Sequence, residues 1–108
     1  MPASDPTGPI VSELVAEDPS FADILTDFVE QLPQRVRQFE ETLEANDLGR
    51  FSSYAHQLKG AGGGYGFPML TELGSRLEQA AQAAQLDECA RMIDELKSIV
   101  ARLVVLPE

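Results

Sequence analysis

The chain contains a single histidine, His56, and this residue lies in a stretch without acidic side chains. None of the 18 aspartate and glutamate residues falls between Asp47 and Glu72, whereas Arg50 and Lys59 lie within that interval. A neutral imidazole can act as a nucleophile near neutral pH. A local excess of positive charge would favour a negatively charged group attached to that ring. The pattern is what a histidine that carries a phosphoryl group would need; an ordinary surface histidine is the alternative.

Four glycines follow the histidine at positions where the sequence predicts a helix. They are Gly60, Gly62, Gly63 and Gly64. Each glycine costs about 1 kcal/mol relative to alanine in a helix, and the four together amount to a large part of a small domain's stability. We expect Gly62 to permit close packing of a neighbouring helix, and the other three to leave the surface beside His56 open to another protein's backbone. A flexible loop over 60–66 is the alternative.

Two charged residues could act on the imidazole. Lys59 follows His56 by one helical turn, so its ammonium can reach a group attached to the ring. If the chain turns at Phe67 between antiparallel helices, His56 and Glu78 are level, because each is eleven residues, or about 16 Å, from that turn. The Glu78 carboxylate could then accept a hydrogen bond from Nδ1–H and leave Nε2 free. The same register places Lys59 level with Ser75; the alternative is that Lys59 and Glu78 are ordinary solvated side chains.

Helices must position these side chains. Apolar residues recur every three or four positions in four long segments, which are about 19–46, about 48–65, Pro68 to about Ala84, and about 87–105. A shorter helix is predicted over about 9–16, and no period-two pattern indicates strands. Long amphipathic helices with short connections are typical of an all-α, antiparallel up-down four-helix bundle, here with the short extra N-terminal helix.

The first long helix carries a start signal and an internal proline. Asp18 can cap a helix that has Pro19 at its first position, where the missing N–H has no consequence. Pro33 lies inside the segment and removes one backbone hydrogen bond, so we expect a kink there. Two helices that are broken at 31–33 are the alternative.

The predicted helix over 48–65 has a packed side and an open side. Its core positions are Phe51, Ala55, Leu58, Gly62 and Tyr65. On the next helix the predicted inward stripe is Leu70, Leu73, Leu77, Ala80, Ala81 and Ala84. His56 is one position away from the packed side of its own helix. We expect a docking surface for a partner protein around it, made of Ser52, Ser53, Gln57, Gly60, Gly63 and Gly64.

Composition excludes several classes of protein. The net charge of −10 argues against nucleic-acid binding, because phosphate backbones attract lysine and arginine patches. There is no signal-peptide pattern, and no run approaches the ~18 apolar residues that a membrane span needs. The single cysteine, Cys89, falls at an apolar helical position, which predicts a buried thiol in a reducing cytoplasm. We expect a cytoplasmic monomer with one domain over 9–108 and a flexible N-terminal arm over 1–8.

Motifs for other chemistry are absent from the sequence. Neither GxxxxGK[ST] nor GxGxxG occurs, and one histidine with one cysteine cannot form a zinc site. We therefore expect no metal and no other cofactor. Nothing in the sequence indicates the pocket or oxyanion hole that a Ser-His-Asp triad would require.

The residues around His56 resemble the histidine-containing phosphotransfer (HPt) domains of multistep two-component phosphorelays. The motif of that family is a histidine followed by x-Leu-Lys-Gly and, after about five residues, a second glycine that opens a turn. Here it reads His56-Gln57-Leu58-Lys59-Gly60, with Gly66 as the second glycine. The resemblance covers about 18–105 and departs at 62–64, where such domains usually have serine or alanine.

This resemblance implies a phosphocarrier without autonomous catalysis. His56 would accept a phosphoryl group from a receiver-domain aspartate and pass it to another receiver, with Lys59 beside the phosphate, Gly60 as the steric gap and Glu78 as the imidazole partner. The implied partners are response-regulator receiver domains and a hybrid histidine kinase; the receiver would supply a Mg²⁺ ion and a lysine. Two alternatives remain: a phosphoacceptor domain of a chemotaxis-type histidine kinase, or a non-catalytic helical interaction bundle. The acceptor helix of a dimerising kinase is less favoured, because Gln57 follows the histidine where an acidic residue is usual.

Overall fold

The structure is a computed structural model that describes residues 9–104. Its four long helices are α2 (Ala22–Glu44), α3 (Leu48–Gly64), α4 (Pro68–Gln82) and α5 (Leu86–Arg102). Before them come the strand β1 (Ile10–Val11), the short helix α1 (Glu13–Glu17) and the 3-10 helix η1 (Pro19–Phe21), and after them the strand β2 (Leu103–Val104). The predicted all-α four-helix bundle with a short N-terminal helix is confirmed. The predicted arm over 1–8 lies outside the described residues.

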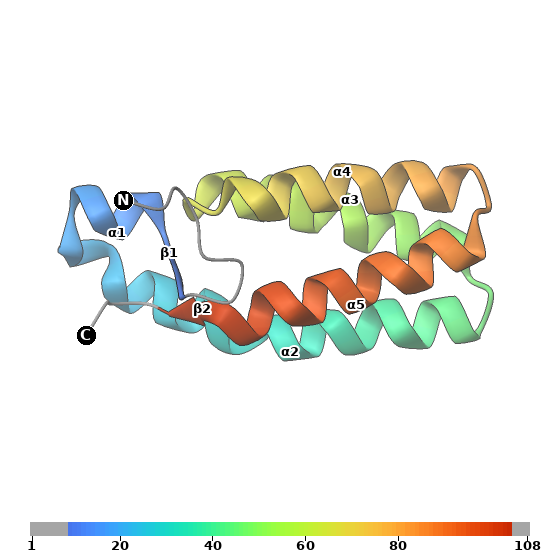
Figure 1. The fold of residues 1–108 in the computed structure, drawn as a ribbon, viewed down its shortest axis with the longest axis horizontal. Coiled ribbons are helices and arrows are strands. Elements are labelled where there is room, and N and C mark those ends of the chain that lie inside the picture. Colours follow the sequence, from blue (N-terminus) through green and yellow to red (C-terminus); the bar gives the residue numbers. More distant parts are fainter. Residues whose placement is uncertain (1–8, 105–108) are drawn as a thin grey trace.

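The four long helices form two layers. Figure 1 shows α3 and α4 in one layer and α2 and α5 in the other, with α1 and η1 at one end of the bundle. Helices that are consecutive in the chain are neighbours, and α5 also packs against α2. The outer face of the α3–α4 layer and the outer face of the α2–α5 layer therefore lie on opposite sides of the bundle.

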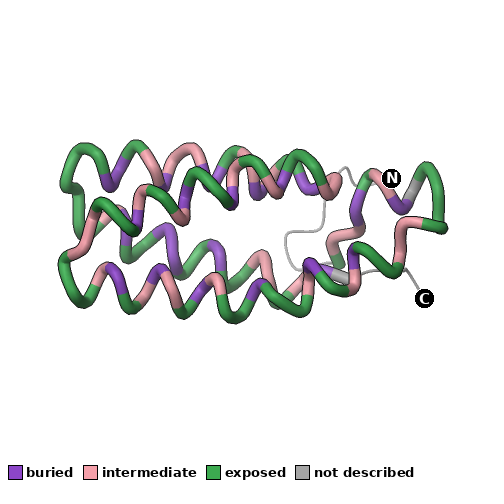
Figure 2. The backbone as a smooth tube through the Cα atoms, turned by 180° about the vertical axis from the view of Figure 1, so that it is seen from behind, coloured by how far each residue is buried: buried purple, intermediate pink, exposed green. Residues whose placement is uncertain are grey.

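The core follows the predicted periodicity. Buried residues line the inner sides of the helices in Figure 2. The largest fully buried apolar side chains are Phe39, Phe51, Phe67, Leu25, Leu32, Leu58, Leu70, Leu73, Leu77 and Leu96. Cys89 is also fully buried, as predicted, and burial raises the pKa of its thiol. The core thus gives the bundle its stability and keeps the Cys89 thiol away from solvent.

The predicted helix over 9–16 is wrong in its first half. Ile10 and Val11 are extended and pair in parallel with Leu103 and Val104, so α5 also ends before the predicted position 105. Helix α1 begins only after Ser12, whose side chain accepts a hydrogen bond from the backbone N–H of Leu14 at 3.0 Å. A pairing of two residues with two distant residues leaves no periodic signal, which is why the sequence did not reveal it.

Helix α2 is continuous through its proline. Asp18 caps η1 by accepting a hydrogen bond from the N–H of Ser20 at 3.0 Å, and α2 then runs from Ala22 to Glu44 with an exposed Pro33 inside it. The alternative of two helices broken at 31–33 is therefore wrong. The kink expected at Pro33 stays a prediction.

The end of α4 differs from the predicted apolar stripe. Ala84 was expected to face inward, but it is exposed and has a positive φ of 54°. The helix ends at Gln82, and Ala84 forms a left-handed closing turn in which the N–H of Gln85 donates to the carbonyl of Ala80 at 2.9 Å. The other five residues of the stripe are buried as predicted.

No helix within residues 9–104 is long and apolar enough to cross a membrane.

Candidate functional site

The two helices that carry the candidate site touch through glycines. A Cβ atom added at Gly62 of α3 would lie 2.7 Å from the backbone nitrogen of Thr71, and one added at Gly74 of α4 would lie 2.7 Å from the backbone nitrogen of Lys59. Both distances are too short for a real side chain. The hydroxyl of Thr71 also donates to the carbonyl oxygen of Lys59 at 3.0 Å. These contacts bring the backbones of α3 and α4 together and fix their relative register.

The register places His56 beside Glu78, as predicted. The Nδ1 atom of His56 lies 3.3 Å from Oε2 of Glu78. The imidazole side chain is 73% exposed, whereas the carboxylate side chain is only 20% exposed. Nδ1 thus faces the carboxylate, and Nε2 is on the other side of the ring.

Lys59 lies on the same side of α3 as His56, one turn further on. Its side chain is half-buried and makes no ion pair with any residue of the described range 9–104. Arg50, the other cation of the acid-free stretch, lies 4.0 Å from Asp47 at the start of α3. The charge of Lys59 is therefore available to an anion near His56, whereas that of Arg50 is partly offset.

The glycines after the histidine belong to the helix. Helix α3 runs to Gly64, and the backbone N–H of Tyr65 donates to the carbonyl of Ala61 at 2.9 Å. The alternative of a flexible loop over 60–66 is therefore wrong.

Of the three glycines that were expected to face open space, two do so and one packs against α4. A Cβ atom at Gly60 or Gly64 would meet nothing within 4 Å, as expected for an open surface. At Gly63 it would lie 3.3 Å from Oγ1 of Thr71. Gly63 is exposed, but the expectation that it has no packing role is wrong, because α4 approaches it closely.

The remaining residues of the predicted docking surface are Ser52, Ser53 and Gln57. Ser53 and Gln57 are exposed and Ser52 is half-buried. Gln57 lines a polar hollow between α3 and α2. That hollow also involves Gln31, Gln34, Arg35 and Gln38. Gln57 thus lies toward α2, whereas the His56 and Gly60 side lies toward α4.

The N-terminal segment holds the turn at which α3 ends. The buried hydroxyl of Ser12 donates to the carbonyl of Tyr65 at 2.6 Å, and the N–H of Glu13 donates to the carbonyl of Gly66 at 2.9 Å. Gly66 has a φ of 80°, and a Cβ atom there would collide with the Ser12 hydroxyl. The ring of Tyr65 stacks on Phe28 of α2 with centroids 4.3 Å apart. The sequence predicted the turn but not the contacts that Ser12, Glu13 and Phe28 make with it.

Sequence reasoning also missed Gly74 and Thr71, although a signal for Gly74 was present. Gly74 lies between the inward residues Leu73 and Leu77, and the count from Phe67 that pairs His56 with Glu78 places Gly74 level with Gly60. A glycine at that position indicates a close approach between helices.

Comparison with known families decides the assignment. Residues 23–105 match the Hpt domain family. This range contains α3, α4, α5, all of α2 except Ala22, and every residue of the candidate site. The chain belongs to the Hpt domain family. Hpt domains serve histidine phosphotransfer in phosphorelays, so this Hpt domain functions in two-component signalling. A search of the curated proteins found no match, and a search of the solved structures found none either.

Proposed function

We propose that this Hpt domain is a cytoplasmic phosphocarrier that accepts a phosphoryl group on His56 from the aspartate of one receiver domain and passes it to another. The observation that supports this role most strongly is the exposed imidazole whose Nδ1 lies 3.3 Å from the Glu78 carboxylate. Such an arrangement holds one ring nitrogen and presents the other. A hybrid histidine kinase is the expected source of the phosphorylated receiver.

The transfer step needs no proton to leave the histidine. The Nε2 lone pair attacks the phosphorus atom of the acyl phosphate, a P–N bond forms, and the P–O bond breaks so that the aspartate leaves as a carboxylate. The ring keeps its Nδ1 proton and becomes positively charged. Glu78 stabilises that charge from the Nδ1 side, and Lys59 offsets the charge of the phosphoryl oxygens.

The glycine side of α3 supports access by the receiver. In-line displacement needs the donor oxygen, the phosphorus and Nε2 on one line, so the receiver backbone must come close to the ring. Gly60 lies one turn from His56, and no described atom occupies the space where its side chain would be. An open surface of this kind suits transfer in both directions, because donor and recipient are both receivers.

The test is a two-step relay with purified proteins. One receiver domain, phosphorylated on its aspartate with labelled phosphate, is mixed with the Hpt domain, and a second receiver is then added. We expect label to appear on the second receiver only when the Hpt domain is present. Equal transfer between the receivers in its absence, or with His56→Ala, would overturn the proposed role.

A further inference from the structure

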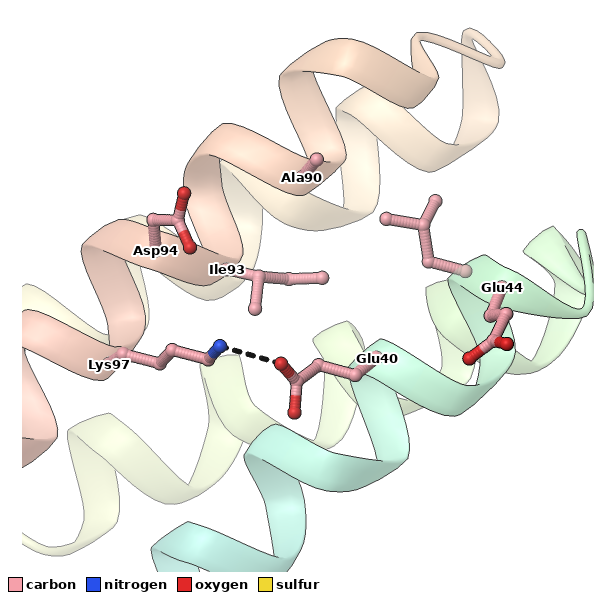
Figure 3. Close-up of a pocket in the computed structure, with 7 residues that line it drawn as sticks. Glu40, Glu44, Ala90, Ile93, Asp94 and Lys97 are labelled. Carbon is pink, nitrogen blue, oxygen red and sulfur yellow. Dashed lines mark ion pairs between the residues drawn. The ribbon is translucent and has the colours of Figure 1, made fainter.

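A hollow of about 290 Å³ lies between α2 and α5. The layer formed by α3 and α4, which carries His56 and Glu78, is on the other side of the bundle. Its apolar part consists of Leu43 from α2 and of Ala90 and Ile93 from α5. Figure 3 shows Ile93 extending from α5 toward α2, with the small Ala90 one turn away. Ile93 is only 4% exposed and forms the floor of the hollow, whereas Ala90 is exposed and its short side chain leaves the hollow open above it.

The rim of this hollow is acidic. Glu40, Glu44 and Asp94 line it, together with one cation, Lys97. Lys97 is already paired, because its Nζ lies 2.6 Å from the Glu40 carboxylate (Figure 3). Glu44 and Asp94 make no ion pair within the described range 9–104. One carboxylate outside the Glu40–Lys97 ion pair thus remains on each side of the apolar floor, although Asp94 also attracts Lys97 electrostatically.

We propose that the α2–α5 hollow binds a basic amphipathic helix of a partner protein, which seats a bulky apolar side chain against Ile93 and places lysine or arginine residues beside Glu44 and Asp94. Charge complementarity selects this occupant. A second copy of this chain carries the same net charge of −10 and would bring an acidic rim against an acidic rim. A helix with basic residues on both sides of an apolar stripe matches both the floor and the rim.

The spacing of the rim on α2 suits a helix that lies along the hollow. Glu40, which pairs with Lys97, and Glu44 are four residues apart on α2. Four residues are about one helical turn, which is also the repeat of basic side chains at i and i+4 on a partner helix. The site is on the face opposite His56, so its occupant leaves the phosphotransfer surface accessible. We infer that such a helix can hold the Hpt domain while a receiver docks.

The binding test uses a labelled synthetic helical peptide with a leucine stripe flanked by lysines, titrated by fluorescence anisotropy against the full chain. Ala90→Leu fills the hollow without changing charge, and we expect it to weaken binding about tenfold, since it excludes one apolar side chain from burial. Ala101→Leu is the matched control, because Ala101 is an exposed alanine of the same helix outside the hollow. It should bind like the wild type. Equal binding by wild type and Ala90→Leu would overturn the proposal.

A second pair of variants distinguishes the effect of the rim carboxylates on peptide affinity from the effect of the protein's overall negative charge. Glu44→Gln with Asp94→Asn should weaken binding and its salt dependence, whereas Asp23→Asn with Glu30→Gln removes the same charge from exposed positions elsewhere on α2 and should change affinity little. Equal weakening by both pairs would mean attraction to the whole acidic protein and would overturn the proposal. So would equal binding of a scrambled peptide, or dimerisation of the chain through this face.

A third measurement tests whether the peptide and the receiver can bind to the two faces at the same time. We expect receiver-to-His56 transfer to proceed at an unchanged rate in the presence of saturating peptide. Competition between the peptide and the receiver would overturn the claim that the two surfaces are independent. Because peptide affinity is measured on the unphosphorylated protein, this inference can fail or succeed separately from the phosphocarrier role.

Discussion

Gly74 of α4 packs directly against the backbone of Lys59 in α3. A Cβ atom at Gly74 would lie 2.7 Å from the Lys59 nitrogen and 2.9 Å from its Cα. One turn beyond Gly74 on the same helix, Glu78 reaches Nδ1 of His56. Helix proximity and imidazole orientation are thus linked through one small residue.

We therefore predict that Gly74→Ala both destabilises the domain and slows transfer. The added methyl group must push α3 and α4 apart, and overpacking of this kind costs about 1–3 kcal/mol in the free energy of unfolding. Urea unfolding and phosphotransfer on the same protein measure the two effects. Gly49→Ala is the control, because its Cβ would meet only Asp47 at an ordinary distance of 3.8 Å. An unchanged unfolding midpoint for Gly74→Ala would mean that the helices do not depend on this contact.

A large side chain at Gly60 should slow phosphotransfer without destabilising the fold. Since a Cβ atom there meets nothing within 4 Å, Gly60→Ala and Gly60→Gln should keep or raise the melting temperature. The glutamine side chain would stand where the receiver backbone must approach, and a displacement of ~1 Å can reduce the rate by about a hundredfold. We expect Gly60→Gln to be folded and defective in transfer, with Gly60→Ala much less affected. Normal transfer by Gly60→Gln would place the docking surface elsewhere.

Lys59 should act through its charge. Lys59→Met keeps most of the half-buried stem and removes the ammonium, so stability should change by less than about 0.5 kcal/mol. A single charge near a surface dianion contributes on the order of 1 kcal/mol, which predicts roughly five- to tenfold slower transfer at low salt. Arg50→Met is the matched control, because Arg50 already lies near Asp47. If both variants transfer equally well, the Lys59 ammonium has no role in the reaction.

Glu78 should contribute both orientation and charge. Glu78→Ala removes the carboxylate 3.3 Å from Nδ1. A single charge beside a largely exposed ring contributes on the order of 1 kcal/mol, which corresponds to roughly a fivefold drop in the transfer rate. Glu78→Gln keeps an acceptor atom and should lose less. Rates measured at several pH values, with Glu72→Gln on the exposed side of α4 as control, test this order. Equal rates for the wild type and both Glu78 variants would show that the carboxylate is only a surface acid.

The sequence was most informative where helical periodicity and counting suffice. Phe51, Ala55 and Leu58 were predicted as core because they recur at helical spacing, and all are buried. His56 and Glu78 were predicted to be level because each lies eleven residues from Phe67, at the turn between two antiparallel helices. This part of the site required no knowledge of side-chain packing.

Long-range contacts were less accessible. The pairing of Ile10 with Leu103 joins the two ends of the described chain and has no local signature. Ala84 is apolar and continues the helical spacing of α4. The backbone is left-handed at this residue, however, and Ala84 is exposed. The packing role of Gly63 depends on Thr71 in the next helix, which periodicity within α3 cannot reveal.

The most direct test of the central claim is the chemistry and position of the phosphorylated residue. Labelled phosphate is transferred from a phosphorylated receiver to the wild-type protein and to His56→Ala, and the stability of the label is followed in acid and in base. We predict a label that is lost in acid, stable in base and absent from His56→Ala. An acid-stable label, or a label retained by His56→Ala, would contradict the assignment of His56 as the phosphoacceptor.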